Sequence, residues 1–445
     1  MPWVDDHNAS LVTDLYELTM AAAYHAEGLA DATATFELWV RRLPPQRRFL
    51  LAAGLDDALR YLEGWSFDDA SLDYLRSLDK FSDGFLDHLA GLRFEGAVWA
   101  VPEGNPVFDG EPLLRITAPL AQAQLQETFL LNAIGFQTMI ASKAARVAIA
   151  CGDRAFIDFG ARRSHGADAA LKGARAAYVG GAARTSMVLA GREYGIPVTG
   201  TMAHSYVQAH PDEATAFEAF ARTFPDDAVF LIDTYDTVRG ARIAAEVAHR
   251  LAEDGIALKG VRLDSGDLAA LAFEVRHVLD GEGLGHVQII ASGGLDEHEV
   301  ARIVASEAPI DAFGVGTSMT TSEDDPNLDI VYKLVQDERG PQMKVSTGKR
   351  TLPGIKQVWR TDTGDTIALA DERRAGDPLL IDVMESGMRL HPPASLKRVR
   401  SHAAESIAAL PDEVRSLEPH EGTPWQVDVS PRLRALEESV AAAHR

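Results

Sequence analysis

The sequence contains a single cysteine, Cys151. One thiol excludes an intrachain disulfide and any metal site built from several cysteine thiolates. A chain of 445 residues, 46% of them hydrophobic, does not need such cross-links, because it can bury large apolar cores. The length favours two domains over one.

Long apolar runs and basic runs are also missing. No apolar run reaches the ~18 residues of a membrane-spanning helix, and residues 1–6 lack the basic and apolar regions of a signal peptide. We therefore expect a cytoplasmic protein with no membrane partner. Lys and Arg total 43 against 66 Asp and Glu, a formal net charge of −23, so we also expect no nucleic-acid partner. A small anionic substrate stays compatible with this charge, since local backbone N–H groups, one or two arginines and a divalent cation suffice to bind it.

Two catalytic signatures are absent as well. No His-x-His pair ends a predicted strand, and His204 and His210 do not have the spacing of a helical zinc pair. No predicted strand ends in a lysine that could form a Schiff base. A metallohydrolase and a lysine-dependent aldolase are therefore disfavoured.

The middle of the chain, residues 151–329, repeats a short apolar strand, a polar strand end and a helix. Such repeats predict parallel strands that are buried on both faces, in a β/α barrel or a doubly wound sheet. Of these we expect an irregular β/α barrel that carries the active site. The expected strands are 155–159, 197–201, 229–233, 260–264, 287–292 and 312–316, and the clearest helix is 237–253.

Both ends of the chain have a different pattern. Apolar and polar residues alternate there in short runs separated by turns, which is typical of antiparallel strands. Residues 1–150 and 330–445 are therefore expected to form one discontinuous, mostly β (α+β) domain into which the barrel is inserted. The expected strands are 35–40, 97–101, 112–117, 330–336, 343–345, 357–360 and 366–369, and the expected helices include 10–30, 50–62, 70–78, 122–140 and 142–150.

Chemistry-bearing side chains stand at the predicted strand ends. His204 follows the strand 197–201, at the edge where catalytic groups of β/α proteins gather, although a hydrogen-bonded structural histidine would fit the same pattern. Arg262 and Asp264 lie two residues apart on one strand, so their side chains share a face. The alternative for this segment is a helix N-cap by Ser265 or Asp267.

Two further patterns indicate a ligand that is planar and phosphorylated. An aromatic anion could stack on Phe159 while Arg162 or Arg163 holds its carboxylate, unless these arginines are an exposed pair at a helix end. Glycines that end two consecutive strands, at residues 292–296 and 314–317, let the backbone approach a phosphate, although one glycine pair alone is commoner in tight turns.

Taken in order, these segments resemble the nicotinate phosphoribosyltransferase family of type II phosphoribosyltransferases. The likeness runs over about residues 11–352. It consists of residues 13–20, 36–38, 52–55, 158–163, 200–205, 262–267, 292–296 and 314–317. Residues 180–186 resemble the family's loop near the pyridine, although Ala182-Ala183-Arg184 departs from its usual pattern.

The resemblance implies a reaction of nicotinate with phosphoribosyl pyrophosphate that gives nicotinate mononucleotide and pyrophosphate in NAD salvage. ATP would be a co-substrate that phosphorylates His204, and Mg²⁺ would be the cofactor, so that the enzyme belongs to the ATP-dependent ligases. A neutral imidazole is a competent nucleophile, and its phosphoramidate is labile enough to be hydrolysed in each cycle. The family is also expected to form homodimers with shared active sites.

The resemblance assigns roles to individual residues. For the pyridine ring, Phe159 and Tyr16, the latter from a second subunit, would stack on opposite faces. Asp264 would act at the reacting centre, by holding ribose hydroxyls or a Mg²⁺-bound water. Nicotinate would be contacted by Arg162, Thr201 and Arg262, and phosphoribosyl pyrophosphate by Arg163, Asp264, Ser292, Gly293, Gly294, Gly314, Gly316 and Thr317.

Other functions fit parts of the same pattern. A phosphoribosyltransferase of this architecture could act on nicotinamide or on quinolinate, although Arg184 favours an acid over an amide and quinolinate calls for a larger basic cluster. A phosphate-binding barrel lyase or isomerase would use no ATP. A non-catalytic nucleotide sensor would release no pyrophosphate.

Overall fold

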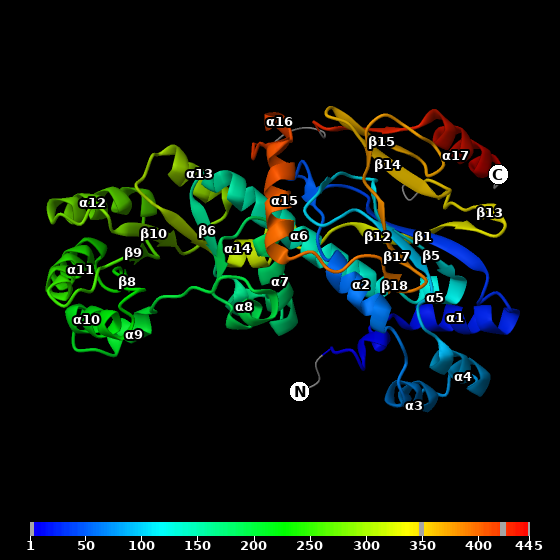
Figure 1. The fold of residues 1–445 in the computed structure, drawn as a ribbon, viewed down its shortest axis with the longest axis horizontal. Helices are drawn as coiled ribbons and strands as arrows, with labels where there is room; N and C mark the ends of the chain where they lie inside the picture. Colours follow the sequence, from blue (N-terminus) through cyan, green and yellow to red (C-terminus); the bar gives the residue numbers. More distant parts are fainter. Residues whose placement is uncertain (1–3, 347–350, 419–423, 444–445) are drawn as a thin grey trace. The chain divides into compact units, whose positions relative to one another are not determined.

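The computed structural model describes residues 4–346, 351–418 and 424–443. The chain divides into two compact units (Figure 1), of which the first comprises Met1–Met139 with Asn327–Arg445 and the second Ile140–Pro326. A curled parallel sheet with helices forms the second unit, and separate, largely antiparallel sheets form the first. The architecture is therefore mixed α/β, as the sequence predicts.

The main sheet of the first unit joins the two ends of the chain. Its seven strands follow the order β13-β12-β1-β5-β3-β17-β18. The central strand β1 (Thr33–Val40) pairs antiparallel with β12 (Ile330–Asp337) on one side and with β5 (Pro112–Pro119) on the other. The remaining strands are β3 (Ala97–Ala100), β13 (Gly340–Pro341), β17 (Ile381–Glu385) and β18 (Met388–Arg389).

Strand β1 is more deeply buried than its alternating sequence suggests. Every residue after Thr33 is buried, including Glu37. The carboxylate of Glu37 lies 2.8 Å from the Nζ atom of buried Lys356, which compensates its charge. Two smaller sheets complete the unit. One has four strands in the order β16-β14-β15-β19, which are β14 (Lys356–Arg360), β15 (Gly364–Leu369), β16 (Asp377–Pro378) and β19 (Gln426–Val429). The other pairs β2 (Leu50–Leu51) with β4 (Pro106–Val107).

Several helices of the first unit differ from the expected ones in their ends. The first helix begins after Asp14 rather than at residue 10. The strand expected at residues 343–345 does not form, because β12 pairs with β13 at Gly340 instead. The two helices expected at 122–140 and 142–150 are a short helix α5 (Leu120–Gln124) and one long helix α6 (Glu127–Cys151), which reaches into the second unit. The others are η1 (Ala9–Leu11), α1 (Leu15–Glu27), α2 (Leu55–Gly64), α3 (Asp69–Ser77), α4 (Asp83–Gly91), α15 (Leu396–Ala408), α16 (Asp412–Arg415) and α17 (Pro431–Ala443).

The second unit is built on a parallel sheet with the order β7-β6-β11-β10-β9-β8. Its strands are β6 (Ala155–Asp158), β7 (Arg184–Thr185), β8 (Val229–Leu231), β9 (Gly260–Leu263), β10 (Gln288–Ser292) and β11 (Ala312–Val315). Its helices are η2 (Ala161–Arg163), α7 (Ala167–Val179), α8 (Val188–Tyr194), α9 (His204–Gln208), α10 (Glu213–Thr223), α11 (Thr237–Ala252), α12 (Leu268–Gly281), α13 (Glu297–Ala305) and α14 (Thr317–Thr320). Among all helices described in the chain, none is long and apolar enough to cross a membrane.

The parallel sheet does not close into a complete barrel. The described strands β7 and β8 form its two edges and do not pair with each other, so the predicted barrel is a curled half-barrel. The strand expected at 197–201 is reduced to one isolated bridge between Val198 and Thr185. Pro197 lacks a backbone donor and Gly200 carries no side chain to pack, which explains why this segment does not extend the sheet.

Alanine-rich helices cover the half-barrel closely. Helix α11 packs between α10 and α12 and against β9 (Figure 1). At Gly240 a Cβ atom would lie 2.0 Å from the carbonyl oxygen of Ile232, so only glycine allows α11 to approach the end of β8 this closely. The carboxyl ends of the parallel strands meet at one edge, where the predicted site residues other than Tyr16 lie.

Candidate functional site

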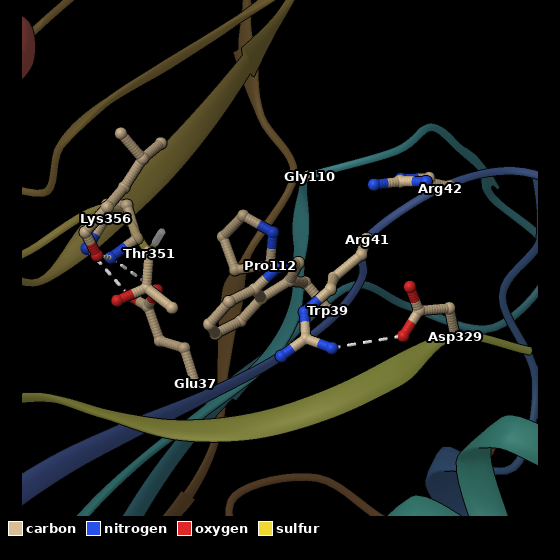
Figure 2. Close-up of a pocket in the computed structure, with 10 residues that line it drawn as sticks. Glu37, Trp39, Arg41, Arg42, Gly110, Pro112, Asp329, Thr351 and Lys356 are labelled. Atoms are coloured by element: carbon tan, nitrogen blue, oxygen red, sulfur yellow. Dashed lines mark hydrogen bonds and ion pairs between the residues drawn. The ribbon is translucent and has the colours of Figure 1, made fainter. Parts of the chain in front are cut away.

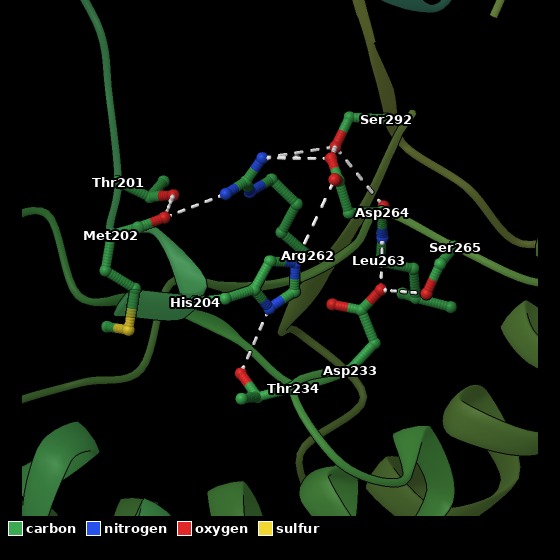
Figure 3. A network of polar contacts seen from close by, with 10 residues as sticks. All are labelled: Thr201, Met202, His204, Asp233, Thr234, Arg262, Leu263, Asp264, Ser265 and Ser292. Atoms are coloured by element: carbon green, nitrogen blue, oxygen red, sulfur yellow. Dashed lines mark hydrogen bonds and ion pairs between the residues drawn. The ribbon is translucent and has the colours of Figure 1, made fainter. Parts of the chain in front are cut away.

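Arg262 is the centre of a polar network at the carboxyl ends of β8, β9 and β10 (Figure 3). Its guanidinium donates to Asp264 at 3.3 Å, to the Ser292 hydroxyl at 3.2 Å and to the carbonyl oxygen of Met202 at 2.8 Å. The hydroxyl of Thr201 donates to the same carbonyl at 3.3 Å. Burial lowers the pKa of Arg262, although Asp264 opposes this shift. The planar guanidinium of Arg262 thus connects the end of β9 with Ser292 of β10 and with the loop that contains Met202.

Two aspartates form the acidic side of this network. The Asp264 carboxylate accepts from the Ser292 hydroxyl at 2.5 Å. Asp233, which follows β8, accepts from the backbone N–H of Asp264 at 2.9 Å and from the Ser265 hydroxyl at 2.7 Å. The cap of α12 is Asp267, so Ser265 is left to bind Asp233. Each of the two carboxylates is therefore held by two hydrogen-bond donors at the ends of β9 and β10.

His204 faces this acidic side from the first turn of α9. Its Nδ1 atom lies 3.2 Å from the Thr234 hydroxyl, and its Nε2 atom lies 4.0 Å from the Asp264 carboxylate. About 41% of the His204 side chain is exposed, so the ring is accessible to a ligand. Because Thr234 occupies Nδ1, Nε2 is the nitrogen that faces the site (Figure 3).

Phe159 lies between the glycine segment of β11 and the guanidinium of Arg262. A Cβ atom on Gly314 would lie 2.4 Å from the Phe159 ring, so this glycine makes room for the ring. The Arg262 guanidinium carbon is 5.9 Å from the ring centroid. The preceding Asp158 accepts from the Gly160 N–H and from the Thr185 hydroxyl, both at 2.8 Å, and thereby fixes the start of the loop that carries Phe159. Burial raises the pKa of Asp158, while these two hydrogen bonds oppose the shift.

The glycine loop after β10, residues 293–296, is open to solvent on one side. Gly293 has φ +92°, and a Cβ atom there would lie 1.9 Å from the carbonyl oxygen of Asp264. Gly294 has φ +64°, and a Cβ atom there would have no neighbour within 4 Å. The loop therefore packs tightly against the end of β9 and leaves free space beside Gly294, as an anion site requires.

The other predicted residues are less closely joined to the network. Arg162 and Arg163 lie exposed on η2, and no hydrogen bond among the described residues links them to it, although Arg162 lies close enough to Arg262 to lower its pKa slightly. Gly316 packs against the Phe159 backbone, and Thr317 is exposed at the start of α14.

Tyr16 belongs to the first unit, on α1. About 47% of this residue is exposed. Burial of its hydroxyl and the nearby carboxylates of Glu127 and Glu17 raise the pKa of Tyr16. With Met20, Tyr24, Phe36, Tyr332 and Lys333, among others, it lines a cavity of about 470 Å³. The ring of Tyr16 is thus available to a ligand or a partner.

Comparisons with known proteins show the family to which this chain belongs. Residues 11–135 match the nicotinate phosphoribosyltransferase (NAPRTase) N-terminal domain, and residues 154–353 match the NAPRTase family. The chain is 49% identical to a nicotinate phosphoribosyltransferase of Mycobacterium tuberculosis over 437 residues, which cover 97% of this chain and 93% of the relative. The chain belongs to the nicotinate phosphoribosyltransferase family.

Two further relatives show that the likeness extends along the chain. A nicotinate phosphoribosyltransferase of Bacillus subtilis is 46% identical over 382 residues, covering 83% of this chain and 78% of its own length. The crystal structure of human nicotinic acid phosphoribosyltransferase superposes with a TM-score of 0.86 at 32% identity, covering 96% of this chain and 99% of the human chain. The sequence resemblance to this family is thus confirmed.

Sequence reasoning missed two side chains of this candidate site, Asp233 and Thr234. Residue 233 was assigned to the end of a strand, and the rule that singled out Asp264, a polar group at the carboxyl end of a parallel strand, applies to it equally. Thr234 carried no signal of its own, because its contact with His204 depends on how two distant loops meet.

The carboxylate pair suits a metal that is bound mainly by its substrate. Within the described residues, no three His, Cys, Asp or Glu side chains gather into a metal-binding group. Oδ1 of Asp233 is nevertheless buried without a hydrogen-bond partner among the described atoms. Mg²⁺ commonly takes one or two carboxylates together with substrate phosphates, so Asp233 and Asp264 fit this ion when a diphosphate is present.

The first unit contains another cavity, lined by several charged side chains, that was not expected from the sequence (Figure 2). It has a volume of about 550 Å³ and is lined by Glu37, Trp39, Arg41, Arg42, Gly110, Pro112, Asp329, Thr351, Leu352 and Lys356. Arg41 is held by Asp329 at 3.2 Å, while Lys356 and Glu37 form their ion pair at the other end. None of the site residues predicted from the sequence lines this cavity.

Proposed function

We propose that this protein transfers the phosphoribosyl group of phosphoribosyl pyrophosphate to nicotinate, which gives nicotinate mononucleotide and pyrophosphate for NAD salvage. The observation that carries the proposal is the convergence of His204, Arg262, Asp264 and Ser292 beside an open glycine loop, in a chain of the NAPRTase family. The relatives named above are nicotinate phosphoribosyltransferases.

The pyridine ring of nicotinate would lie on Phe159, with its carboxylate directed at positive charge. Arg262, next to the Phe159 ring, and the nearby Arg162 supply that charge, and Thr201 adds a hydroxyl. A guanidinium binds a carboxylate through two parallel hydrogen bonds, which an amide cannot accept in the same way. This favours nicotinate over nicotinamide.

The ribose and its phosphates would occupy the acidic side and the glycine loop. Transfer of a ribosyl group passes through a cationic, oxocarbenium-like state, which the carboxylates of Asp264 and Asp233 would stabilise. Gly293 and Gly294 offer exposed backbone to the 5′-phosphate, with Arg163, Ser292, Gly314, Gly316 and Thr317 as further proposed contacts. Bound Mg²⁺ would neutralise the departing pyrophosphate.

ATP would enter the cycle through His204. Its Nε2 atom would attack the γ-phosphorus, so that an N–P bond forms, the bond to the ADP oxygen breaks and ADP leaves. Water then cleaves the N–P bond and releases phosphate. The hydrogen bond between Nδ1 and Thr234 supports this orientation of the ring, since it directs the free nitrogen into the site.

Tyr16 would complete the pyridine site from a second subunit of a homodimer. Its partly exposed ring, beside a cavity in the first unit, supports this role. Stacking between two aromatic rings would hold the planar substrate from both faces.

Pyrophosphate release from nicotinate and phosphoribosyl pyrophosphate, with and without ATP, tests the proposed function. We expect release with nicotinate that increases when ATP and Mg²⁺ are added, and markedly less with nicotinamide or quinolinate. Pyrophosphate release only with quinolinate or nicotinamide would favour a related phosphoribosyltransferase. No release with any of the three pyridines would favour the lyase, isomerase or sensor alternatives.

Replacement of His204 by alanine is expected to abolish the stimulation by ATP and to leave slow, ATP-independent transfer. The matched control is His210→Ala, because the His210 ring binds the Tyr206 carbonyl at 2.8 Å instead of the network. Initial rates with and without ATP, and acid-labile phosphate on the protein, measure the effect. ATP coupling that persists in the His204 variant would disprove the phosphohistidine.

A further inference from the structure

A group of four buried charges lies directly behind the glycine loop. Glu297, the first residue of α13, is fully buried, and its carboxylate lies 2.6 Å from Lys143 Nζ and 2.8 Å from Arg146 Nε. Lys143 also lies 2.8 Å from the Asp324 carboxylate. Two positive and two negative side chains therefore balance one another inside the second unit; we call them the buried charge group.

Burying four charges is costly, and apolar residues of similar volume commonly stabilise a protein as well or better. Desolvation by burial would raise the pKa of Glu297, but Lys143 and Arg146 outweigh it and lower that pKa, so the carboxylate is charged at neutral pH. What a buried ion pair provides beyond apolar packing is a fixed position and direction.

The glycine loop needs such an anchor. Gly293 and Gly294 both have positive φ and carry no side chains, so this half of the loop is held by packing only where the Gly293 backbone meets the end of β9. Its C-terminal half is held at three points. The Leu295 carbonyl accepts from the buried Ser318 hydroxyl at 2.6 Å, the Asp296 side chain accepts from the Glu299 N–H at 2.8 Å, and Glu297, the next residue, belongs to the buried charge group. Ser318 follows the glycine segment of β11, so this contact also joins the two glycine segments.

We propose that Glu297, held by Lys143 and Arg146, is a positioning residue that sets the glycine loop at the distance needed to bind the 5′-phosphate of the ribosyl substrate. The proposal rests on the proposed function. Only Leu295 and Asp296 separate Glu297 from Gly294, so a shift of the first turn of α13 moves the loop. In the described part of the chain, Glu297 has no contact with Arg262, Asp264 or His204, so it acts through the loop alone.

Glu297→Gln tests the proposal, because it removes the charge and keeps the shape. The dissociation constant for ribose 5-phosphate and the KM for phosphoribosyl pyrophosphate are expected to rise about tenfold, since a small misplacement of a binding group has effects of this size or more. The KM for nicotinate and the kcat at saturating phosphoribosyl pyrophosphate are expected to stay within about threefold of the wild type, because the pyridine contacts are untouched.

The same helix offers a matched control. Glu299 lies in the first turn of α13 and pairs with Arg302 at 2.6 Å on the surface, so Glu299→Gln removes an ion pair. The hydrogen bond from its backbone N–H to Asp296 in the loop does not depend on this side chain. We expect this variant to bind ribose 5-phosphate like the wild type. The double variant Lys143→Met with Glu297→Met leaves one positive and one negative charge, and it replaces the single variant if Glu297→Gln does not fold.

The outcomes separate this proposal from the proposed function. If the wild type releases no pyrophosphate with nicotinate, the proposed function fails, but the ribose 5-phosphate constants still decide the role of Glu297. Unchanged binding of ribose 5-phosphate by a folded Glu297 variant would overturn the positioning role. So would a wild type that does not bind ribose 5-phosphate, or unfolding of both variants, which would assign the buried charge group to stability alone.

Discussion

Arg262→Ala is expected to lower kcat/KM for the transfer of phosphoribosyl to nicotinate by about a thousandfold. The substitution removes three hydrogen bonds at once, to Asp264, Ser292 and the Met202 carbonyl. It also removes the positive charge near which the carboxylates of Asp264 and Asp233 both lie. The loss thus combines misplaced groups with an unfavourable charge balance at the reacting centre.

Lysine is not expected to replace Arg262. Its ammonium is a single point charge and cannot reach three acceptors that surround a planar fork, so we expect Arg262→Lys to recover at most about a tenth of the activity. The matched control is Arg276 on α12. Its guanidinium also donates three hydrogen bonds, to Asp280 and to the carbonyls of Leu284 and Val287, none of which belongs to the Arg262 network. Arg276→Ala should leave kcat/KM within about threefold of the wild type.

Steady-state rates over both substrates, with thermal unfolding as a check of folding, measure these effects. Activity of Arg262→Ala close to that of the Arg276 variant would show that the Arg262 network is structural. It would also remove the main support for placing nicotinate on Phe159.

Local patterns in the sequence were sufficient to predict the side chains at the end of β9 and the glycine segments at the ends of β10 and β11. The spacing of Arg262 and Asp264 predicts a shared face, and in the structure the two side chains are in contact. The glycine pairs at 293–294 and 314–316 were likewise recognisable, although Gly314 turned out to accommodate the Phe159 ring. These features depend on backbone geometry within a few residues, which the sequence encodes directly.

Features that depend on distant segments were not predictable in this way. Closure of the parallel sheet depends on whether its two edges meet, and no local pattern reports that β7 is an edge strand and that residues 197–201 form only an isolated bridge. The buried charge group was missed because Lys143 and Arg146 lie in a largely apolar helix and their partners come from residues 297 and 324. Tertiary structure alone brings these charges together.

Gly293→Ala is expected to destabilise the protein by about 3 kcal/mol, because an alanine is strained at positive φ and its methyl group would overlap the Asp264 carbonyl. That Cβ atom would lie 1.9 Å from the carbonyl oxygen, so either the loop or the end of β9 has to move. Since β9 carries both Arg262 and Asp264, kcat/KM is expected to fall by at least about a hundredfold.

The neighbouring Gly294 separates strain in the fold from loss of the phosphate site. A Cβ atom there meets nothing within 4 Å, so Gly294→Ala should cost only about 1 kcal/mol for its positive φ. Its methyl group would still occupy the space proposed for the 5′-phosphate, and the KM for phosphoribosyl pyrophosphate should rise about tenfold with little change in kcat. Thermal unfolding and substrate-dependent rates distinguish the two variants. A Gly294 variant that binds phosphoribosyl pyrophosphate normally would show that the phosphate lies elsewhere, because the space beside this residue would then be unused.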